Sequence, residues 1–289
     1  MDHTDFIEPK RGYLKSDFAL FHLKDMKSMQ FEYHYHDFNK IIVFISGSVT
    51  YLIEGKAHRL KPWDILFVSS SEVHKPIIDS SVLYERIVIW VNPGFLGNHS
   101  NDCDLFTCFN LAVERKSNLL RLESTALKDI KFMLSKLEEA CKSNGFGSVI
   151  LKNAIFLQLL VALIREQLGT GVDNNASDIA TDKSIQDLLD YINLNIDKDL
   201  TIDTLAAAFY LNRYHMMHKF KKQTGYSVHS YILQKRLIKA DLLIRAGIPA
   251  AQACEQSGFN DYSSFVRAFK KLFGLSPKNR AKVKSSFTP

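Results

Sequence analysis

Residues Gly258 to Pro277 read GFNDYSSFVRAFKKLFGLSP, a short turn followed by an amphipathic helix pattern that ends in glycine. The last part of this stretch, FKKLFGLS from Phe269 to Ser276, matches FKKQTGYS from Phe220 to Ser227 at a constant offset of 49 residues. A pattern that recurs at a fixed spacing predicts two copies of one supersecondary unit. The C-terminal part of the chain is therefore expected to contain an internal duplication.

Each copy has the pattern of two helices joined by a tight turn. In the first copy, Thr201 and Asn212 are expected to cap successive helices, and Gly225 is expected to end the second helix in a left-handed conformation. In the second copy, the two helices are expected to end at Gly258 and Gly274. This arrangement predicts a helix-turn-helix, whose second helix enters the major groove of DNA.

Helical periodicity divides each second helix into a buried face and an exposed face. Met216 and Phe220 in one copy, and Phe265 and Phe269 in the other, fall on the side that faces the core. Exposed Arg, Tyr, Ser and His can contact base edges, Met and Val can meet a thymine methyl group, and lysines suit phosphates. The residues predicted to bind DNA are Arg213, Tyr214, Met217, His218, Lys221, Lys222, Tyr262, Ser263, Val266, Arg267, Lys270 and Lys271.

One further helical pattern, SYILQKRLIKADLLIRAG, lies between the two copies. A rigid connecting helix would hold the two reading helices in fixed relation, so that they reach successive grooves about 34 Å apart. The charge of the chain agrees with a DNA partner, since Tyr210 to Pro289 has 15 Lys and Arg against three acidic residues, while the whole chain is only +6. Charge alone is weaker evidence, because many basic faces are only solvated.

The N-terminal part has a different pattern. From about Phe18 to Val91, short apolar runs such as KIIVFISG and DILFVSSS alternate with turn residues, which predicts an antiparallel sandwich or barrel. Gly47-Ser48 and Glu54-Gly55 are expected to form hairpin turns. With 289 residues and 46% hydrophobic content, the chain is long enough for two folded domains.

A helix pair is expected at about residues 123–168. Its second helix carries an apolar seam at Ile150, Ala154, Leu157, Val161, Ile164 and Leu168. This pair either packs only within its own domain, or packs on the sheet and also forms a homodimer, which is the interpretation we favour. Residues 169–180, GTGVDNNASDIA, have the composition of a flexible linker. The domains are then 1–168 and 181–289, and Ser184 is expected to cap the first helix of the second domain.

Five motifs within Thr201 to Arg280 occur in a characteristic order. They are Leu205-Ala206, FKKxxGYS at Phe220, RLxxAxxLL at Arg236, GFNDxSSFxRxFKK at Gly258 and GLSPxxR at Gly274. In these motifs the chain resembles the DNA-binding domain of the AraC family of bacterial transcription regulators. The resemblance implies an activator that binds double-stranded DNA through two reading helices, with RNA polymerase as a possible further partner. The departures from the family pattern are Ala250, Ala253, Cys254 and Asn279, which predict a less stable second copy.

The N-terminal domain resembles, more loosely, the cupin sensor domain found in such regulators, a small β-barrel whose mouth binds an effector. His34 and His36 lie two apart on one strand, and His74 follows later. Lys40 stands where cupin enzymes have a glutamate ligand, although three imidazoles could still bind zinc. A polar effector pocket, a metal site and a structural role all remain open. We predict effector binding at His34, His36, Lys40 and His74, with no metal and no cofactor.

The predicted fold class is α+β, with a cupin-like β-barrel and helical dimerisation element followed by an all-α double helix-turn-helix domain. A metal-dependent cupin enzyme with a basic appendage and a sequence-indifferent DNA-coating protein are the alternative functions. No catalytic residues are assigned, because the sequence has no arrangement typical of other enzyme chemistry. The four cysteines form no C-x-x-C pair, which indicates reduced thiols, and the N-terminus lacks a signal-peptide pattern. The protein is therefore expected in the cytoplasm, with no membrane partner.

Overall fold

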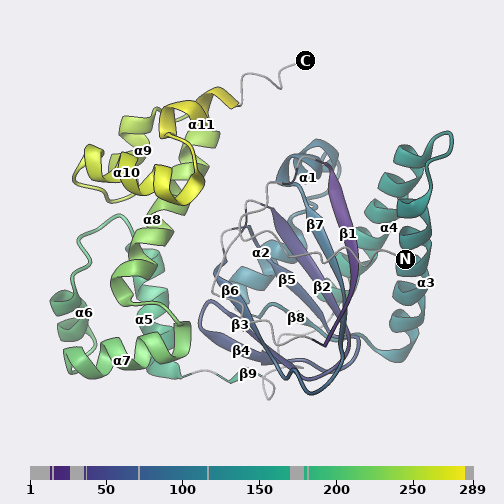
Figure 1. Ribbon diagram of the computed structural model, residues 1–289, viewed down its shortest axis with the longest axis horizontal. Coiled ribbons are helices and arrows are strands. Elements are labelled where there is room, and N and C mark those ends of the chain that lie inside the picture. The colour runs from purple at the N-terminus through teal and green to yellow at the C-terminus, as the bar shows by residue number, and fades with distance from the viewer. Residues whose placement is uncertain are drawn as a thin grey trace. The chain divides into compact units, whose positions relative to one another are not determined.

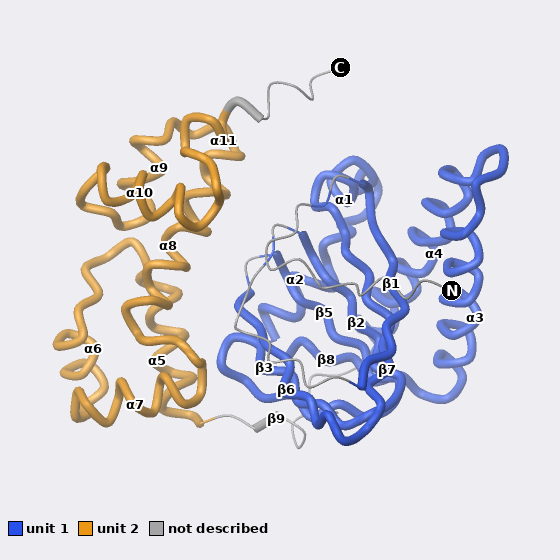
Figure 2. The backbone as a smooth tube through the Cα atoms, viewed as in Figure 1, with its two compact units in different colours: residues 1–180 blue, residues 181–289 orange. Residues whose placement is uncertain are grey.

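The chain folds into two compact units, residues 1–180 and 181–289 (Figure 2). The computed structural model describes residues 14, 16–26, 36, 38–70, 72–115, 117–169, 179–180 and 182–283. Among these, the first unit contains the strands and four helices, whereas the second contains only helices (Figure 1). This confirms the predicted combination of a sheet-rich N-terminal domain with a helical C-terminal domain. All four cysteines are free thiols.

Two antiparallel sheets form the first unit. One has the order β1(Phe18–Asp25), β7(Tyr84–Val91), β2(Asn39–Ser46), β5(Ile65–Val68), β8(Leu119–Leu120), and the other has the order β6(His74–Ile78), β3(Val49–Ile53), β4(Lys56–Arg59), β9(Ile179–Ala180). One apolar cluster joins the facing sides of the two sheets, with Ile42 and Val88 from the first and Tyr51 and Ile53 from the second. The expected antiparallel sandwich or barrel is thus confirmed.

Of the two hairpin turns expected from the sequence, one is confirmed and one is wrong. Glu54 and Gly55 connect the paired strands β3 and β4, and both have the positive φ of a tight two-residue hairpin, 45° and 79°. Gly47 instead lies between β2 and β3, which belong to different sheets. Its φ is +121°, and a Cβ there would lie 2.9 Å from the backbone oxygen of Leu83. Glycine is therefore required at this position by a close backbone approach, not by a hairpin.

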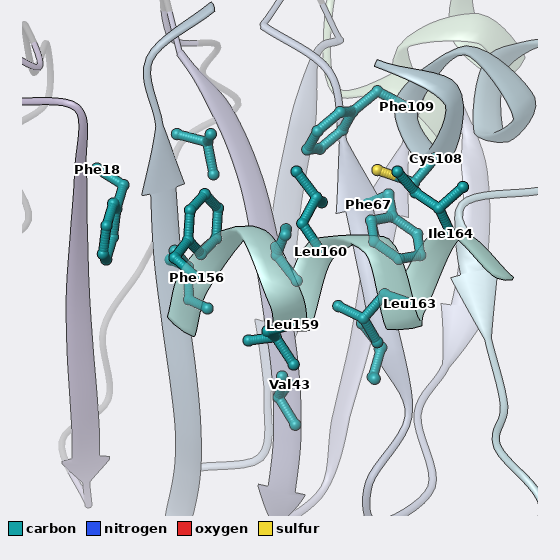
Figure 3. Packing of buried hydrophobic residues seen from close by; sticks show 14 of the residues in the cluster. Phe18, Val43, Phe67, Cys108, Phe109, Phe156, Leu159, Leu160, Leu163 and Ile164 are labelled. Atoms are coloured by element: carbon teal, nitrogen blue, oxygen red, sulfur yellow. The ribbon is translucent and has the colours of Figure 1, made fainter. Parts of the chain in front are cut away.

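Helices cover the outer face of the five-stranded sheet. They are α1(Pro93–His99), α2(Thr107–Glu114), α3(Ser124–Lys142) and α4(Ser148–Gly169). Figure 3 shows Leu159, Leu160 and Leu163 of α4 packed against sheet residues that include Val43 and Phe67. These side chains are almost fully buried. By length and composition α4 could cross a membrane, but one face of it is part of the core of this unit.

The predicted seam on α4 is only partly buried. Ile164 packs in the core of its own unit, whereas Ile150, Ala154 and Leu168 are exposed. Only 22% of the most apolar stretch of α4 is buried. The helix therefore packs on the sheet through one face and leaves much of its other apolar surface uncovered.

The second unit contains seven helices within the described residues. They are α5(Lys183–Leu194), α6(Ile202–Ala208), α7(Arg213–Thr224), α8(Val228–Arg245), α9(Ala250–Gln256), α10(Tyr262–Phe273) and α11(Pro277–Val283). The expectation that Ser184 caps α5 is wrong, because the cap is Asp182, whose carboxylate accepts hydrogen bonds from the amide and hydroxyl of Ser184. Asp182 also pairs with Lys219 of α7 at 2.7 Å. A contact distant in sequence thus holds the cap residue.

Helix α8 connects the two halves of this unit (Figure 1). Near its start, the Tyr231 ring lies 5.6 Å from the Phe220 ring of α7, and its hydroxyl donates to Asn193 of α5. Farther along, Asp241 accepts two hydrogen bonds from Arg280 of α11. One continuous helix therefore contacts both copies of the duplicated unit and holds them in one arrangement.

Candidate nucleic-acid interface and effector site

The two second helices, α7 and α10, begin and end alike. The Asn212 side chain accepts hydrogen bonds from the amides of Tyr214 and His215, and the Asp261 carboxylate accepts from the amides of the equivalent first turn of α10. Both helices end at a left-handed glycine, Gly225 at φ 76° and Gly274 at φ 77°. These caps confirm the predicted duplication, because each is formed by residues inside its own copy.

The buried faces of α7 and α10 also agree with the predictions. Met216, Phe220, Phe265 and Phe269 have no exposed surface. Phe259 packs against Phe265, with ring centroids 5.1 Å apart. Because these apolar side chains fix the rotation of each helix about its axis, they also fix which side chains point into solvent.

The opposite face of each helix carries the residues predicted to bind DNA. Tyr214 and Tyr262 are 71% and 46% exposed, and eight others of the twelve are also exposed. Met217 and Val266 are half-buried. The exposed side chains are therefore available to a partner, while their contact with DNA stays a prediction.

Two exposed residues of the first copy were missed by the sequence reasoning. His215 is exposed on α7, one turn before His218, and this spacing of three could have identified it. Tyr210 is 97% exposed in the turn between α6 and α7, with a φ of 53°. A left-handed tyrosine gives no clear sequence signal, because this conformation is uncommon outside glycine and asparagine.

The two reading helices differ in charge at their first turns. On α7, the pKa of Arg213 is raised by a hydrogen bond from its guanidinium to Asp203 of α6, 3.1 Å away. On α10, the pKa of Asp261 is lowered by hydrogen bonds from Ser264, so this cap remains an anion. The neutral Asn212 cap thus leaves α7 the more cationic helix at its N-terminal end.

The interior of the barrel brings together three of the four residues predicted to bind an effector. The His36 ring lies 5.5 Å from the His74 ring and 6.1 Å from the Trp90 ring. The Lys40 ammonium lies 5.8 Å from the centre of the Trp90 ring. His36, Lys40 and His74 are all buried, whereas the fourth residue, His34, lies outside the described residues.

Two further buried polar residues, Lys56 and His58, extend this interior site along β4. Ile53 of β3 pairs with both Lys56 and His74, which places these residues in one row across the four-stranded sheet. Sequence reasoning missed them because KAHR reads as an exposed polar strand. Within the part of the chain that the structure describes, no group of three His, Cys, Asp or Glu side chains is placed to hold a metal.

The stability of the first unit is expected to depend on the protonation of His58. Burial, with a smaller contribution from Lys56, lowers the pKa of His58 from 6.5 to about 4. Between these values the unfolded chain binds the proton more strongly, so stability falls as pH falls. We expect a loss of about 2 kcal/mol at about pH 5 relative to neutral pH. Urea unfolding followed by the fluorescence of Trp63 and Trp90, both in this unit, measures the loss.

His58→Leu is expected to remove this contribution to the pH dependence, because the substituted side chain does not titrate. His218→Leu, on an exposed face of the other unit, is the control and should leave the slope unchanged. An equal slope in His58→Leu and in the original chain would show that His58 is not the responsible group.

Comparisons with known proteins match both units. A helix-turn-helix domain family matches residues 205–282, and the AraC-like ligand binding domain family matches residues 25–160. The HTH-type transcriptional activator RhaR of Mannheimia succiniciproducens is 25% identical over 256 residues, which cover 86% of each chain. The HTH-type transcriptional activator RhaS of Enterobacter sp. is 22% identical over 254 residues, again 86% of each chain. A solved structure of ToxT from Vibrio cholerae is 14% identical, with a TM-score of 0.35, over 92% of this chain and 98% of ToxT.

Proposed function

We propose, because this chain belongs to the AraC family of bacterial transcription regulators, that it binds DNA sequence-specifically, activates transcription and responds to a small-molecule effector in its N-terminal barrel. Both family matches and the relatives named as transcriptional activators support this function. Effector binding would shift the population of protein molecules that are competent to bind DNA. The regulator acts in the cytoplasm, where double-stranded DNA and RNA polymerase are its macromolecular partners.

The observation that carries the proposal is the pair of exposed reading faces on α7 and α10. Each face has its own buried core residues and matching caps, and α8 connects both copies. A single exposed basic helix would be weak evidence for sequence reading. Two equivalent helices in one helical unit are what reading two successive grooves requires.

Arg267→Ala is expected to weaken binding to the cognate duplex by about 1–3 kcal/mol and to relax the preference at one base pair. Arg267 is exposed on α10, and its guanidinium donates to Ser264 at 3.1 Å, which orients it one turn from the start of the helix. Selection of bound duplexes from a random pool by the full-length protein first supplies the cognate sequence. Two short boxes about one helical turn apart are the expected result.

Lys270→Ala is the matched control, because Lys270 is exposed farther along the same helix. It should weaken all duplexes to a similar extent and lower the salt dependence of binding by about one unit of slope. Equal losses on cognate and random duplexes for Arg267→Ala would contradict base reading by α10. A sequence-indifferent DNA-coating protein would give that result.

The uncovered apolar side of the helix pair α3 and α4 supports a homodimer. On the seam of α4, Ile150 and Leu168 are 77% and 56% exposed, and Ala154, one turn after Ile150, is exposed as well. Soluble monomers rarely leave large apolar side chains clustered in solvent without a binding partner. A second copy of this chain would cover these residues, while Phe156 and its neighbours on the opposite face remain packed on the sheet.

Ile150→Glu is expected to raise the dissociation constant of the dimer about 10-fold to 100-fold, since a buried isoleucine contributes about 1.5–3 kcal/mol. Light scattering across a dilution series measures the change. Ile77→Glu makes the same substitution at an isoleucine that is 50% exposed on β6, in the sheet that the helix pair does not cover, and should leave the dimer intact. A protein that is monomeric at all concentrations would exclude this dimer.

An enzymatic role is the weaker function. The metal-dependent cupin alternative needs a complete ligand set, and the relatives are named as transcriptional activators. We therefore assign no catalytic residue and no cofactor. Stoichiometric metal in the purified protein, together with its loss in His74→Ala, would favour the cupin alternative.

A further inference from the structure

The buried polar side chains between the two sheets are mainly cations and imidazoles. Lys40 and Lys56 are 3% and 8% exposed, and both point into the interior from strands of opposite sheets. His58, two residues after Lys56 on β4, is fully buried and faces the same side. Charged ammonium groups are rarely buried, because their transfer out of water is costly.

Two of these interior residues have polar atoms without a hydrogen-bond partner among the described residues. They are both ring nitrogens of His58 and the indole Nε1 of Trp90. Buried nitrogen atoms are nearly always hydrogen-bonded in folded proteins, so such groups call for a partner that the described residues do not supply. The indole can only donate, and the neutral imidazole has one donor.

Several carboxylates of this unit are already engaged with other groups. Asp25 accepts a hydrogen bond from Arg86 at 2.6 Å. Asp64 accepts two from Arg121, and Glu72 accepts from Asn118 and a backbone amide. Among the described residues, these three carboxylates therefore already have partners, while Lys40 and Lys56 bring positive charge into the interior.

The walls around these groups are apolar and aromatic. The Phe38 and Trp90 rings are stacked 4.5 Å apart, and Tyr51 and Leu66 belong to the same buried cluster. A ligand bound here would place an apolar body against these rings. A neutral sugar fits this set of groups less well, because it brings no charge opposite to that of the lysines.

We propose that the effector is an organic anion with one carboxylate on an apolar or aromatic body, and that Lys56 and His58 bind it together with Lys40 and Trp90. This inference rests on the proposed effector function and names the chemical class of the effector. The carboxylate accepts from His58 and from the indole, and the lysines supply the opposite charge. Hydrogen bonds between charged partners are about twice as strong as neutral ones.

Matched pairs of carboxylates and amides test the proposal on the full-length protein. The probes are octanoate against octanamide and benzoate against benzamide, which keep the apolar body and remove only the charge. At neutral pH, at least one carboxylate should raise the melting temperature of the first unit and bind about tenfold or more tightly than its amide. Glucose is the uncharged polyol probe. Equal binding within both pairs, or stabilisation by glucose alone, would overturn the proposal.

Lys56→Met and Arg59→Met locate the site. Each substitution removes one cation from β4. Arg59, however, is exposed and lies on the side of the strand that faces away from the interior. Lys56→Met should reduce carboxylate affinity at least tenfold, whereas Arg59→Met should leave it unchanged. Equal losses in the two variants would show a diffuse charge effect and no site. If Lys56→Met fails to fold, the carboxylate and amide comparison on the original chain still decides.

DNA binding distinguishes failure of this inference from failure of the proposed function. If the protein selects specific duplexes but binds no carboxylate above its amide, the effector class is wrong and the regulator function stands. If a carboxylate binds and Lys56→Met abolishes this binding, the anion site stands. If the bound carboxylate then leaves the affinity for DNA unchanged, the effector part of the proposed function fails instead.

Discussion

Arg280→Met is expected to destabilise the helical unit by about 3–5 kcal/mol, because it leaves a buried carboxylate without its principal partner. The Arg280 guanidinium donates to both oxygens of Asp241, at 2.7 and 3.1 Å, and both side chains are less than one-tenth exposed. Burial raises the pKa of Asp241 even with this pair in place. Urea unfolding followed by circular dichroism measures the loss, while tryptophan fluorescence reports separately on the first unit.

The matched control is Arg245→Met, because Arg245 donates to the same carboxylate at 2.8 Å from the following turn of α8. This side chain is 30% exposed, so its loss should cost no more than about 1 kcal/mol. The double variant Asp241→Leu with Arg280→Met should recover much of the stability, since no buried charge remains. Equal losses for Arg280→Met and Arg245→Met would contradict the dominant role of the buried pair.

Gly258→Ala is expected to destabilise the same unit by about 2–5 kcal/mol. Gly258 has a φ of +83°, a conformation that costs alanine about 1–2 kcal/mol. A Cβ there would also lie 2.8 Å from the Cα of Asp197 and from the backbone oxygen of Ile196. These are backbone atoms that cannot rotate away, so overpacking adds about 1–3 kcal/mol. Chemical denaturation of the full-length protein measures the change.

Gly274→Ala separates the two causes. Gly274 has nearly the same φ, +77°, but a Cβ there meets nothing within 4 Å. This variant should therefore lose only about 1–2 kcal/mol. A loss in Gly258→Ala no greater than that in Gly274→Ala would show that the contact with the Asp197 segment relaxes at little cost.

Most of the second unit could be predicted from the sequence because its helices are defined locally. The caps Thr201, Asn212 and Gly274 act on amides or carbonyls within four residues, so their effect does not depend on the rest of the fold. The buried phenylalanines recur at helical spacing for the same reason. The prediction at Ser184 was wrong because the cap lies two residues earlier, at Asp182, which a long-range ion pair with Lys219 holds in place.

The two candidate sites also differ in how far the sequence predicts them. The exposed reading faces follow from helix periodicity once Phe265 and Phe269 are assigned to the core. The proposed site for an anionic effector does not follow from periodicity, because Lys56 and His58 come from a short polar strand whose burial depends on the opposite sheet. Alternation along a strand indicates which residues share a face, but not which face is covered.

The sequence by itself thus determined the duplicated helical unit, its caps and its reading faces, since these follow from interactions between residues a few positions apart. Only the tertiary structure decided that Gly47 joins two sheets, that Gly258 touches the Asp197 backbone, and that Lys56 lies inside the barrel. Each of these depends on which distant segments come into contact. Such contacts are selected by burial of the whole core, which no local pattern along the chain specifies.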